Sequence, residues 1–272
     1  MIKRFSFVIL ILTSFASFGQ KSFSFESKIN SEKTYNQTMI MTSVDTMKYF
    51  NEGTLLEDKT TERRSSTEVS RTLTTKKVNE KDEIPATIEL GKIISIVNGN
   101  KTENVLSGTL VKGIYKFRNK FKVDEVISDK INDKIKESIK YALENVKPDI
   151  DFPKEPLKIG DSFEHKMPMT FQVNDGASLV VFENIKIYTL RSVIMDIAIF
   201  DLKEKFQIST EIEQVNFDGE GKGSGIVEFN IEENQIIKDN SSFILEFNMK
   251  VNNSVTMYSK LNTNSEKIMI IN

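Results

Sequence analysis

Cysteine is absent from this 272-residue chain, and histidine occurs once. Without cysteine there are no disulfides, no thiolate nucleophile, no cysteine-ligated zinc or iron–sulfur cluster, and no lipidated cysteine of the kind that anchors a bacterial lipoprotein. The lone histidine, His165, has no second histidine or cysteine with which to build a His-rich metal site or a Cys–His pair. We therefore predict no cofactor and no metal site.

Two interpretations of His165 stay open. One is a general base or metal ligand, because imidazole titrates near neutral pH. The other, which we favour, is a surface residue within the polar phrase FEHKM. No G-x-S-x-G nucleophile elbow occurs in the chain, so nothing supports a Ser-His-Asp hydrolase. The sequence predicts a protein that is not an enzyme and has no catalytic residues.

A strong charge of one sign is also missing, since 37 basic and 39 acidic residues leave a net charge of −2. This balance gives no overall field that would attract nucleic acid. The chain is 39% hydrophobic and has 19 Phe, which is enough for a packed core. One local row of cations has two interpretations. We favour the solvated side of a strand, and the alternative is a binding site for an anionic head group. The row consists of Lys112, Lys116, Arg118, Lys120 and Lys122.

Long hydrophobic runs are missing except near the N-terminus. The pair Lys3–Arg4 precedes an apolar run over residues 7–12, and small residues follow up to Gly19. This is the layout of a secretory signal peptide, and the run is too short to span a bilayer. We expect residues 1–19 to be cleaved and residues 20–272 to form a single β-rich domain in the periplasm or outside the cell. We expect no membrane span in the mature chain.

Most of the remaining chain alternates apolar and polar residues with period two, which predicts half-buried strands. One such stretch has an apolar face formed by Phe243, Leu245, Phe247, Met249 and Val251. A second stretch has an apolar face formed by Tyr115, Phe117, Phe121 and Val123. Residues 192–200 also predict one strand, and the Thr-rich residues 60–77 predict an edge strand, a water-facing hairpin or a mobile segment.

One segment has a helical period. Its apolar stripe consists of Ile131, Ile135, Ile139, Ala142, Leu143 and Val146. Ser128 or Asp129 is the expected N-cap, and Pro148 ends the helix. The sequence therefore predicts a mainly β fold of the α+β type, in which one large curled antiparallel sheet packs on a single amphipathic helix near residues 129–147.

Four of the five prolines lie close together after this helix, and strand interiors exclude proline. They predict an extended corner that leads into the next strand, with the turn at Gly160, where glycine is free to take positive φ. The phrase FPKEPLKIGDSFEHKMPM resembles a segment common in uncharacterised exported bacterial proteins. The matching residues are Pro153, Pro156, Leu157, Lys158, Ile159, Gly160, Asp161, Ser162 and Phe163.

The order of strands, helix and strands also resembles the lipoprotein-carrier half-barrels of bacterial envelopes. In that family a curled antiparallel sheet covers an apolar cavity with helices, usually more than the one helix found in this sequence. The resemblance implies a half-barrel fold and an apolar ligand.

A glycine-rich run over residues 216–225 has two interpretations. Asn216, Asp218 and Glu220 alternate before Gly221 in the manner of a calcium loop, but a valine stands where that loop ends in a carboxylate. The interpretation that we favour is a loose hairpin turn, because four glycines in seven residues supply a permissive backbone.

The aromatic and methionine residues on the strand faces lead to a hypothesis about function. If one helix leaves part of the concave face exposed, that face marks a lipid, peptide or partner site. We predict an exported, non-catalytic binding protein for an apolar or amphiphilic ligand in the bacterial envelope. The alternatives are a structural or protein-interaction module with a filled core and an envelope partner, and, third, a hydrolase. The expected ligand-binding residues are Tyr115, Phe117, Phe121, Phe243, Phe247 and Met249.

Overall fold

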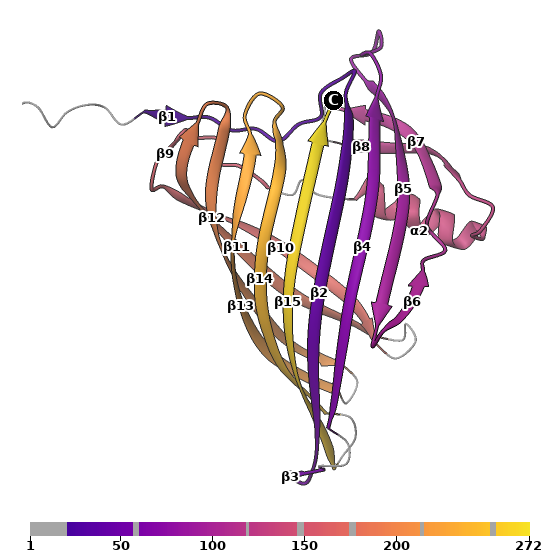
Figure 1. The fold of residues 1–272 in the computed structure, drawn as a ribbon, viewed down its shortest axis with the longest axis vertical. Coiled ribbons are helices and arrows are strands. Elements are labelled where there is room, and N and C mark those ends of the chain that lie inside the picture. Colours follow the sequence, from indigo (N-terminus) through magenta and orange to yellow (C-terminus); the bar gives the residue numbers. More distant parts are fainter. Residues whose placement is uncertain are drawn as a thin grey trace, which may run out of the picture.

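The computed structural model describes residues 21–56, 60–117, 120–145, 150–173, 178–212, 215–250 and 254–272. Within these residues the chain forms one 13-stranded sheet, one two-stranded sheet and a single helix (Figure 1). The large sheet is antiparallel and curls without closing, which confirms the predicted fold class. The predicted signal peptide, residues 1–19, lies outside the described residues.

The strands of the large sheet come from both sides of the helix. The long strands before it are β2 (Thr34–Asn51), β4 (Thr61–Thr75), β5 (Ile84–Val97), β7 (Thr109–Lys116) and β8 (Lys120–Ile127). Those after it are β10 (Ser162–Val173), β11 (Ser178–Ile194), β12 (Ile197–Ile212), β13 (Val215–Asn230), β14 (Gln235–Lys250) and β15 (Val255–Ile271). The short strands are β1 (Ser22–Phe23), β3 (Thr54–Leu55), β6 (Asn100–Glu103) and β9 (Leu157–Lys158).

The strand order follows the chain, with one long-range junction. From edge to edge it runs β10-β11-β12-β13-β14-β15-β2-β4-β5-β7-β8, with β3 and β6 paired beside β2 and β5. The last strand, β15, therefore pairs with β2, and Ile271 lies opposite Tyr35. The edges of the sheet are β8 and β10, because the chain between them forms the helix, the proline-rich corner and β9 instead of a hairpin.

Helix α2 (Asp133–Glu144) packs on the edge strand β8. Its N-cap is Asn132, whose Oδ1 accepts a hydrogen bond of 3.0 Å from the Ile135 N–H. The expected cap at Ser128 or Asp129 is wrong, because the Ser128 hydroxyl accepts from the Lys130 N–H in the turn before the helix. The described helix is thus shorter than the predicted 129–147, and Val146 and Pro148 lie outside the described residues.

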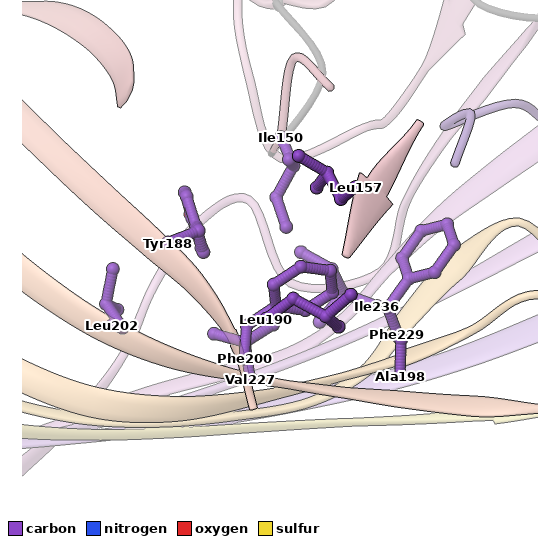
Figure 2. Close-up of a cluster of buried hydrophobic side chains, with 10 residues drawn as sticks. All are labelled: Ile150, Leu157, Tyr188, Leu190, Ala198, Phe200, Leu202, Val227, Phe229 and Ile236. Carbon is purple, nitrogen blue, oxygen red and sulfur yellow. The ribbon is translucent and has the colours of Figure 1, made fainter. Parts of the chain in front are cut away.

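Two apolar clusters lie on the same side of the large sheet, and we call this side the inner face. The first cluster, shown in Figure 2, consists of Ile150, Leu157, Tyr188, Leu190, Ala198, Phe200, Leu202, Val227, Phe229 and Ile236. Ile150 and Leu157 belong to the segment between the helix and β10, so the proline-rich corner covers the strands beneath it. The second cluster consists of Tyr35, Leu73, Ala86, Ile88, Val111, Phe121, Val123 and Met269, and α2 packs on it through Ile139 and Leu143.

The predicted turn before β10 is confirmed, and its residues explain the sequence of the corner. Gly160 has φ of +95°, a conformation that residues with a Cβ rarely adopt. The Asp161 carboxylate accepts a hydrogen bond of 2.8 Å from the Lys158 N–H. Phe163 then enters the first cluster, with its ring 5.3 Å from that of Tyr188. Glycine, aspartate and the aromatic residue each have a separate structural task here.

Two strand assignments from the sequence are wrong. Residues 192–200 form the β11–β12 hairpin, with Met195 at φ +53° in the turn. Residues 60–77 contain β4, which lies inside the sheet between β2 and β5 and not at an edge. Two of its inner-face pairs are small and polar, Ser65 with Ser43 and Thr67 with Ser95, so this part of an interior strand needs few apolar residues.

The glycine-rich run is also not a hairpin, because it lies within the strand β13. Gly219, Gly221, Gly223 and Gly225 all face inward, opposite inner-face residues of β14. A Cβ on Gly221 would lie 3.0 Å from Leu245 Cδ1 and 3.1 Å from the Phe206 ring. The missing side chains let residues of β12 and β14 meet above β13, where the Phe206 and Phe243 rings lie 4.9 Å apart. We call this line of four glycines the glycine crease.

The N-terminal strap, residues 21–33, crosses the ends of the strands before β2 begins. Phe25 packs on the first cluster, with ring centroids 5.3 Å from Phe152 and 5.4 Å from Phe200. Lys33 Nζ lies 2.7 Å from the Glu233 carboxylate in the β13–β14 turn. The strap ends at the buried Tyr35, whose hydroxyl accepts from the Asn30 N–H at 2.9 Å.

Alkaline pH should destabilise the fold through Tyr35. Burial, with a smaller contribution from Glu233, raises the pKa of Tyr35 to about 12, against about 10 in an unfolded chain. The unfolded state therefore loses this proton first, and stability falls as the pH rises from about 10 to about 12. A Tyr35→Phe variant should lose less stability than the unmodified protein between pH 9 and 12, as measured by urea denaturation at each pH. An equal alkaline loss in both proteins would contradict this assignment.

Candidate ligand-binding site on the inner face

The six predicted ligand-binding residues fall into three places in the structure. Tyr115 and Phe121 lie at the second apolar cluster, with ring centroids 4.8 Å apart, and Phe121 is buried. Burial raises the pKa of Tyr115. These two residues fill the core next to the helix. Phe117 is 86% exposed at the β7–β8 turn, with φ of +53°.

Phe117 does not share a strand face with Tyr115, so that part of the sequence analysis is wrong. The alternating stretch that contains it is a hairpin, and Lys116 pairs with Lys120 across the turn. A period-two pattern does not reveal where a chain reverses, because both arms of a hairpin keep the same alternation.

The other three predicted residues do lie together on the inner face of β14. Phe243, Phe247 and Met249 alternate with outward residues, and Leu245 lies between them. We call Phe243, Leu245, Phe247 and Met249 the β14 stripe. All four side chains are half-buried, and none belongs to either apolar cluster. Among the residues whose side chains are described, the stripe is therefore an apolar part of the inner face that lies outside the two cores.

Neighbouring strands extend this apolar surface with residues that the sequence did not identify. Leu245 pairs with Leu261 and Met249 pairs with Met257, both on β15. Phe206 of β12 is buried and meets Phe243 across the glycine crease. Alternation identified each strand but not its partner. The inward glycines were the one signal that β12 and β14 approach each other.

A cluster of polar residues lies on the inner face beside this surface. The polar cluster consists of Asn184 and Lys186 on β11 and Glu204 on β12. Lys186 Nζ lies 3.2 Å from the Glu204 carboxylate, and their side chains are 17% and 4% exposed. Burying either charge without its partner would strongly destabilise the fold, so the two residues depend on each other.

His165 pairs with Lys186 on the edge strand β10 and is 6% exposed. The favoured interpretation of His165 as a surface residue is therefore wrong. The phrase around it is polar because outward residues of β10 alternate with the inward His165, so composition hid its burial.

Asn184 is the residue of the polar cluster whose hydrogen bonding is incomplete. It is 5% exposed, and its Oδ1 is buried without a hydrogen-bond partner. A buried acceptor without a donor costs about 1–3 kcal/mol. Along the row of register pairs, Asn184 lies opposite Phe206, Phe206 opposite Gly221, and Gly221 opposite Leu245. Asn184 thus shares a register row with Leu245 of the β14 stripe.

A surface hollow of ≈ 660 Å³ crosses strands β12 to β15 on the outer face of the sheet. Most of its lining residues face outward, among them Lys203, Lys222 and Asn262, and Phe243 is one of the few inner-face residues that border it. The hollow therefore opens on the face opposite the β14 stripe.

The other chemistries considered from the sequence receive no site in the described residues. No group of three or more histidine, aspartate and glutamate side chains lies close enough to hold a metal ion there. The calcium interpretation of residues 216–225 is wrong, because these residues form a paired strand and not a loop. The described lysines of the cationic row point outward, and Lys112 and Lys116 lie near Glu125 and Glu83. Arg118 lies outside the described residues.

Comparison with known proteins adds no functional assignment. No protein-family model matches this chain, and no curated protein matches it in sequence. In the part of the chain that the structure describes, no helix has both the length and the apolar character needed to cross a membrane.

Proposed function

We propose that this protein is an exported, non-catalytic binding protein of the bacterial envelope that holds an apolar or amphiphilic ligand on the inner face of its half-barrel. The observation that supports the proposal is the β14 stripe, a half-buried apolar surface outside both described clusters. A contiguous apolar surface that stays partly exposed is typical of a ligand site. The resemblance to lipoprotein-carrier half-barrels points to the same class of ligand.

The energetics suit a single alkyl chain. Covering about 200 Å² of apolar surface with a chain of this kind contributes about 5 kcal/mol. The polar cluster lies beside the stripe, so the site offers a polar region as well as an apolar one. Lys186 and Glu204 place two opposite charges at one border of the apolar surface. This arrangement favours an amphiphile over a pure hydrocarbon.

A charge on the β14 stripe should weaken binding, and a charge on the outer face of the same strand should not. We expect Met249→Asp to raise the Kd for 1-decanol about tenfold, because the new carboxylate would have to lose water when the alkyl chain covers it. Asn248→Asp is the matched control, since Asn248 is the preceding residue and is exposed on the other face. The measurement is isothermal titration calorimetry on both variants, with circular dichroism to establish that both are folded.

Native mass spectrometry of the protein gently purified from its own envelope tests the same proposal without a variant. We expect a co-purifying mass in the range of a single-chain or double-chain lipid. A clean apo mass, together with equal decanol affinity of the Met249→Asp and Asn248→Asp variants, would overturn the binding function.

The interaction module remains the second candidate because of one observation on the outer face. Five isoleucines are at least 39% exposed there, on strands β2, β13, β14 and β15. They are Ile40, Ile226, Ile244, Ile268 and Ile270. Such a module needs no small molecule. A clean apo mass, together with equal decanol affinity of the Met249→Asp and Asn248→Asp variants, would therefore favour it.

A further inference from the structure

Three lysines lie together on the outer face, at the hollow that crosses β12 to β15. They are Lys203 and Lys205 on β12 and Lys222 on β13, and all three are exposed. We propose that this hollow binds a phosphomonoester group, carried either by a soluble sugar or polyol phosphate or by a lipid head group. The hollow opens on the face opposite the β14 stripe, so this inference does not depend on the proposed function.

The register of β12 and β13 brings the three positive charges close together. Lys205 pairs directly with Lys222, and Lys203 lies two residues away on the same face of β12, opposite Ser224. Directly opposed side chains have Cβ atoms about 5 Å apart, and diagonal neighbours are about 7–8 Å apart. Three long side chains at this spacing can direct their ammonium groups onto one phosphate, whose oxygens accept several charge-assisted hydrogen bonds.

No carboxylate of the described residues forms an ion pair with any of the three lysines. On the β11 side, Lys203 and Lys205 have Ile187 and Ile185 as register partners, so this flank is apolar. On the β13 side, Lys205 has another lysine as its partner. Like charges directly opposite each other destabilise a strand pair. A bound anion would relieve this repulsion, so the free protein sacrifices stability at the place where we expect the phosphate.

The charge of the surroundings fits a doubly charged ligand. Asp201 accepts a hydrogen bond of 3.0 Å from Arg191 Nε, and Glu246 lies 2.7 Å from Lys260 Nζ, so both carboxylates already have cationic partners. The other acidic neighbour is the exposed Glu220, in the next register row of β13. Three ammonium groups against this one carboxylate leave two positive charges. A phosphomonoester carries about −1.5 to −2 at pH 7 and balances them.

The rest of the lining fits a phosphate that is attached to a hydroxylated group. Ser224, Ser242 and Asn264 form one register row across the hollow and supply hydroxyl and amide groups. These groups both donate and accept hydrogen bonds, as the hydroxyls of a sugar or of glycerol do. The hollow of ≈ 660 Å³ has room for such a group in addition to the phosphate.

The test uses two probes that differ in the phosphate, namely glycerol 3-phosphate and glycerol, titrated by calorimetry into the purified protein at low salt. We expect only glycerol 3-phosphate to bind. Lys222→Gln should raise its Kd about tenfold, because one charge-assisted hydrogen bond is lost. The thermal midpoint of the free variant should stay equal or rise, since the repulsion with Lys205 is gone.

The matched control is Lys112→Gln, which removes the same charge from β7, where Lys112 lies 3.3 Å from Glu125. This variant should leave the Kd unchanged. Equal weakening by Lys112→Gln and Lys222→Gln would show that only the overall charge of the protein matters, and the site would be refuted. Decanol affinity should be the same in Lys222→Gln and the unmodified protein, which separates this site from the inner face.

Sedimentation with phosphatidylcholine vesicles, with and without phosphatidic acid, distinguishes the two sources of the phosphate. Binding that requires both phosphatidic acid and Lys222 identifies a lipid head group as the ligand. Binding of glycerol 3-phosphate without binding to the vesicles identifies a soluble phosphate. If neither glycerol 3-phosphate nor the phosphatidic acid vesicles bind, the inference is wrong, whatever the outcome of the decanol titrations.

Discussion

Replacing Gly223 with valine should destabilise the protein by about 3 kcal/mol, although valine is by far the better strand residue. Gly223 lies in the glycine crease, and a Cβ there would be 2.8 Å from Phe243 Cβ and 2.8 Å from the Ser242 carbonyl oxygen. These atoms belong to the paired strand β14, so they cannot move away without distorting the sheet. The cost of this overlap should exceed the gain of up to about 1 kcal/mol from β-propensity. Urea denaturation measures the difference.

Ser224→Val is the matched control for this prediction. Ser224 is the next residue, faces outward and is exposed, so the same side chain there should change the stability by less than about 0.5 kcal/mol. If Gly223→Val were as stable as the unmodified protein, or more stable, the packing of β12 against β14 would not require glycine at this position. The contact of Phe206 with Phe243 across β13 would then need another explanation.

Removing the positive charge of the buried ion pair should have an effect of similar size. Lys186→Met keeps most of the aliphatic side chain but leaves the Glu204 carboxylate, 4% exposed, without its partner. A buried charge without its partner typically costs about 3–5 kcal/mol, and we expect the lower end because Lys186 is partly exposed. Chemical denaturation of the variant at neutral pH gives the loss directly.

The double variant Lys186→Met with Glu204→Leu should recover most of this stability. Two apolar residues of suitable volume are often as stable as the buried pair that they replace, because neither pays a desolvation cost. The recovery isolates the charge as the cause. If the double variant were as unstable as Lys186→Met, the loss would come from packing around Lys186, and the ion pair would contribute little.

The fold class could be predicted because burial imposes alternation on every half-buried strand. The faces of β14 and the apolar stripe of α2 appear directly in the sequence, and the turn at Gly160 follows from proline exclusion and positive φ. These features depend on neighbours along the chain. Local hydropathy is therefore enough to find them.

The parts that the sequence did not reveal depend on neighbours across the sheet. Whether a strand is central or at an edge is decided by its partners, so the polar β4 was misplaced. The burial of His165 and the ion pair of Lys186 with Glu204 depend on the register of three adjacent strands. The stripe on β14 was found, but Phe206 was not, because the contact between β12 and β14 needs the empty inner side of β13.

The junction of β15 with β2 also has a consequence for how the chain folds. Thr34 and Asn272 exchange two backbone hydrogen bonds, at 2.9 and 3.0 Å, although they are nearly the full length of the chain apart. Contacts between residues so far apart in the sequence raise the contact order of the fold, and we therefore expect slow folding. Until the final residues arrive, the backbone of β2 has an unpaired flank that other extended chains are able to join. Truncating the last strand should therefore convert a slow folder into an aggregating one.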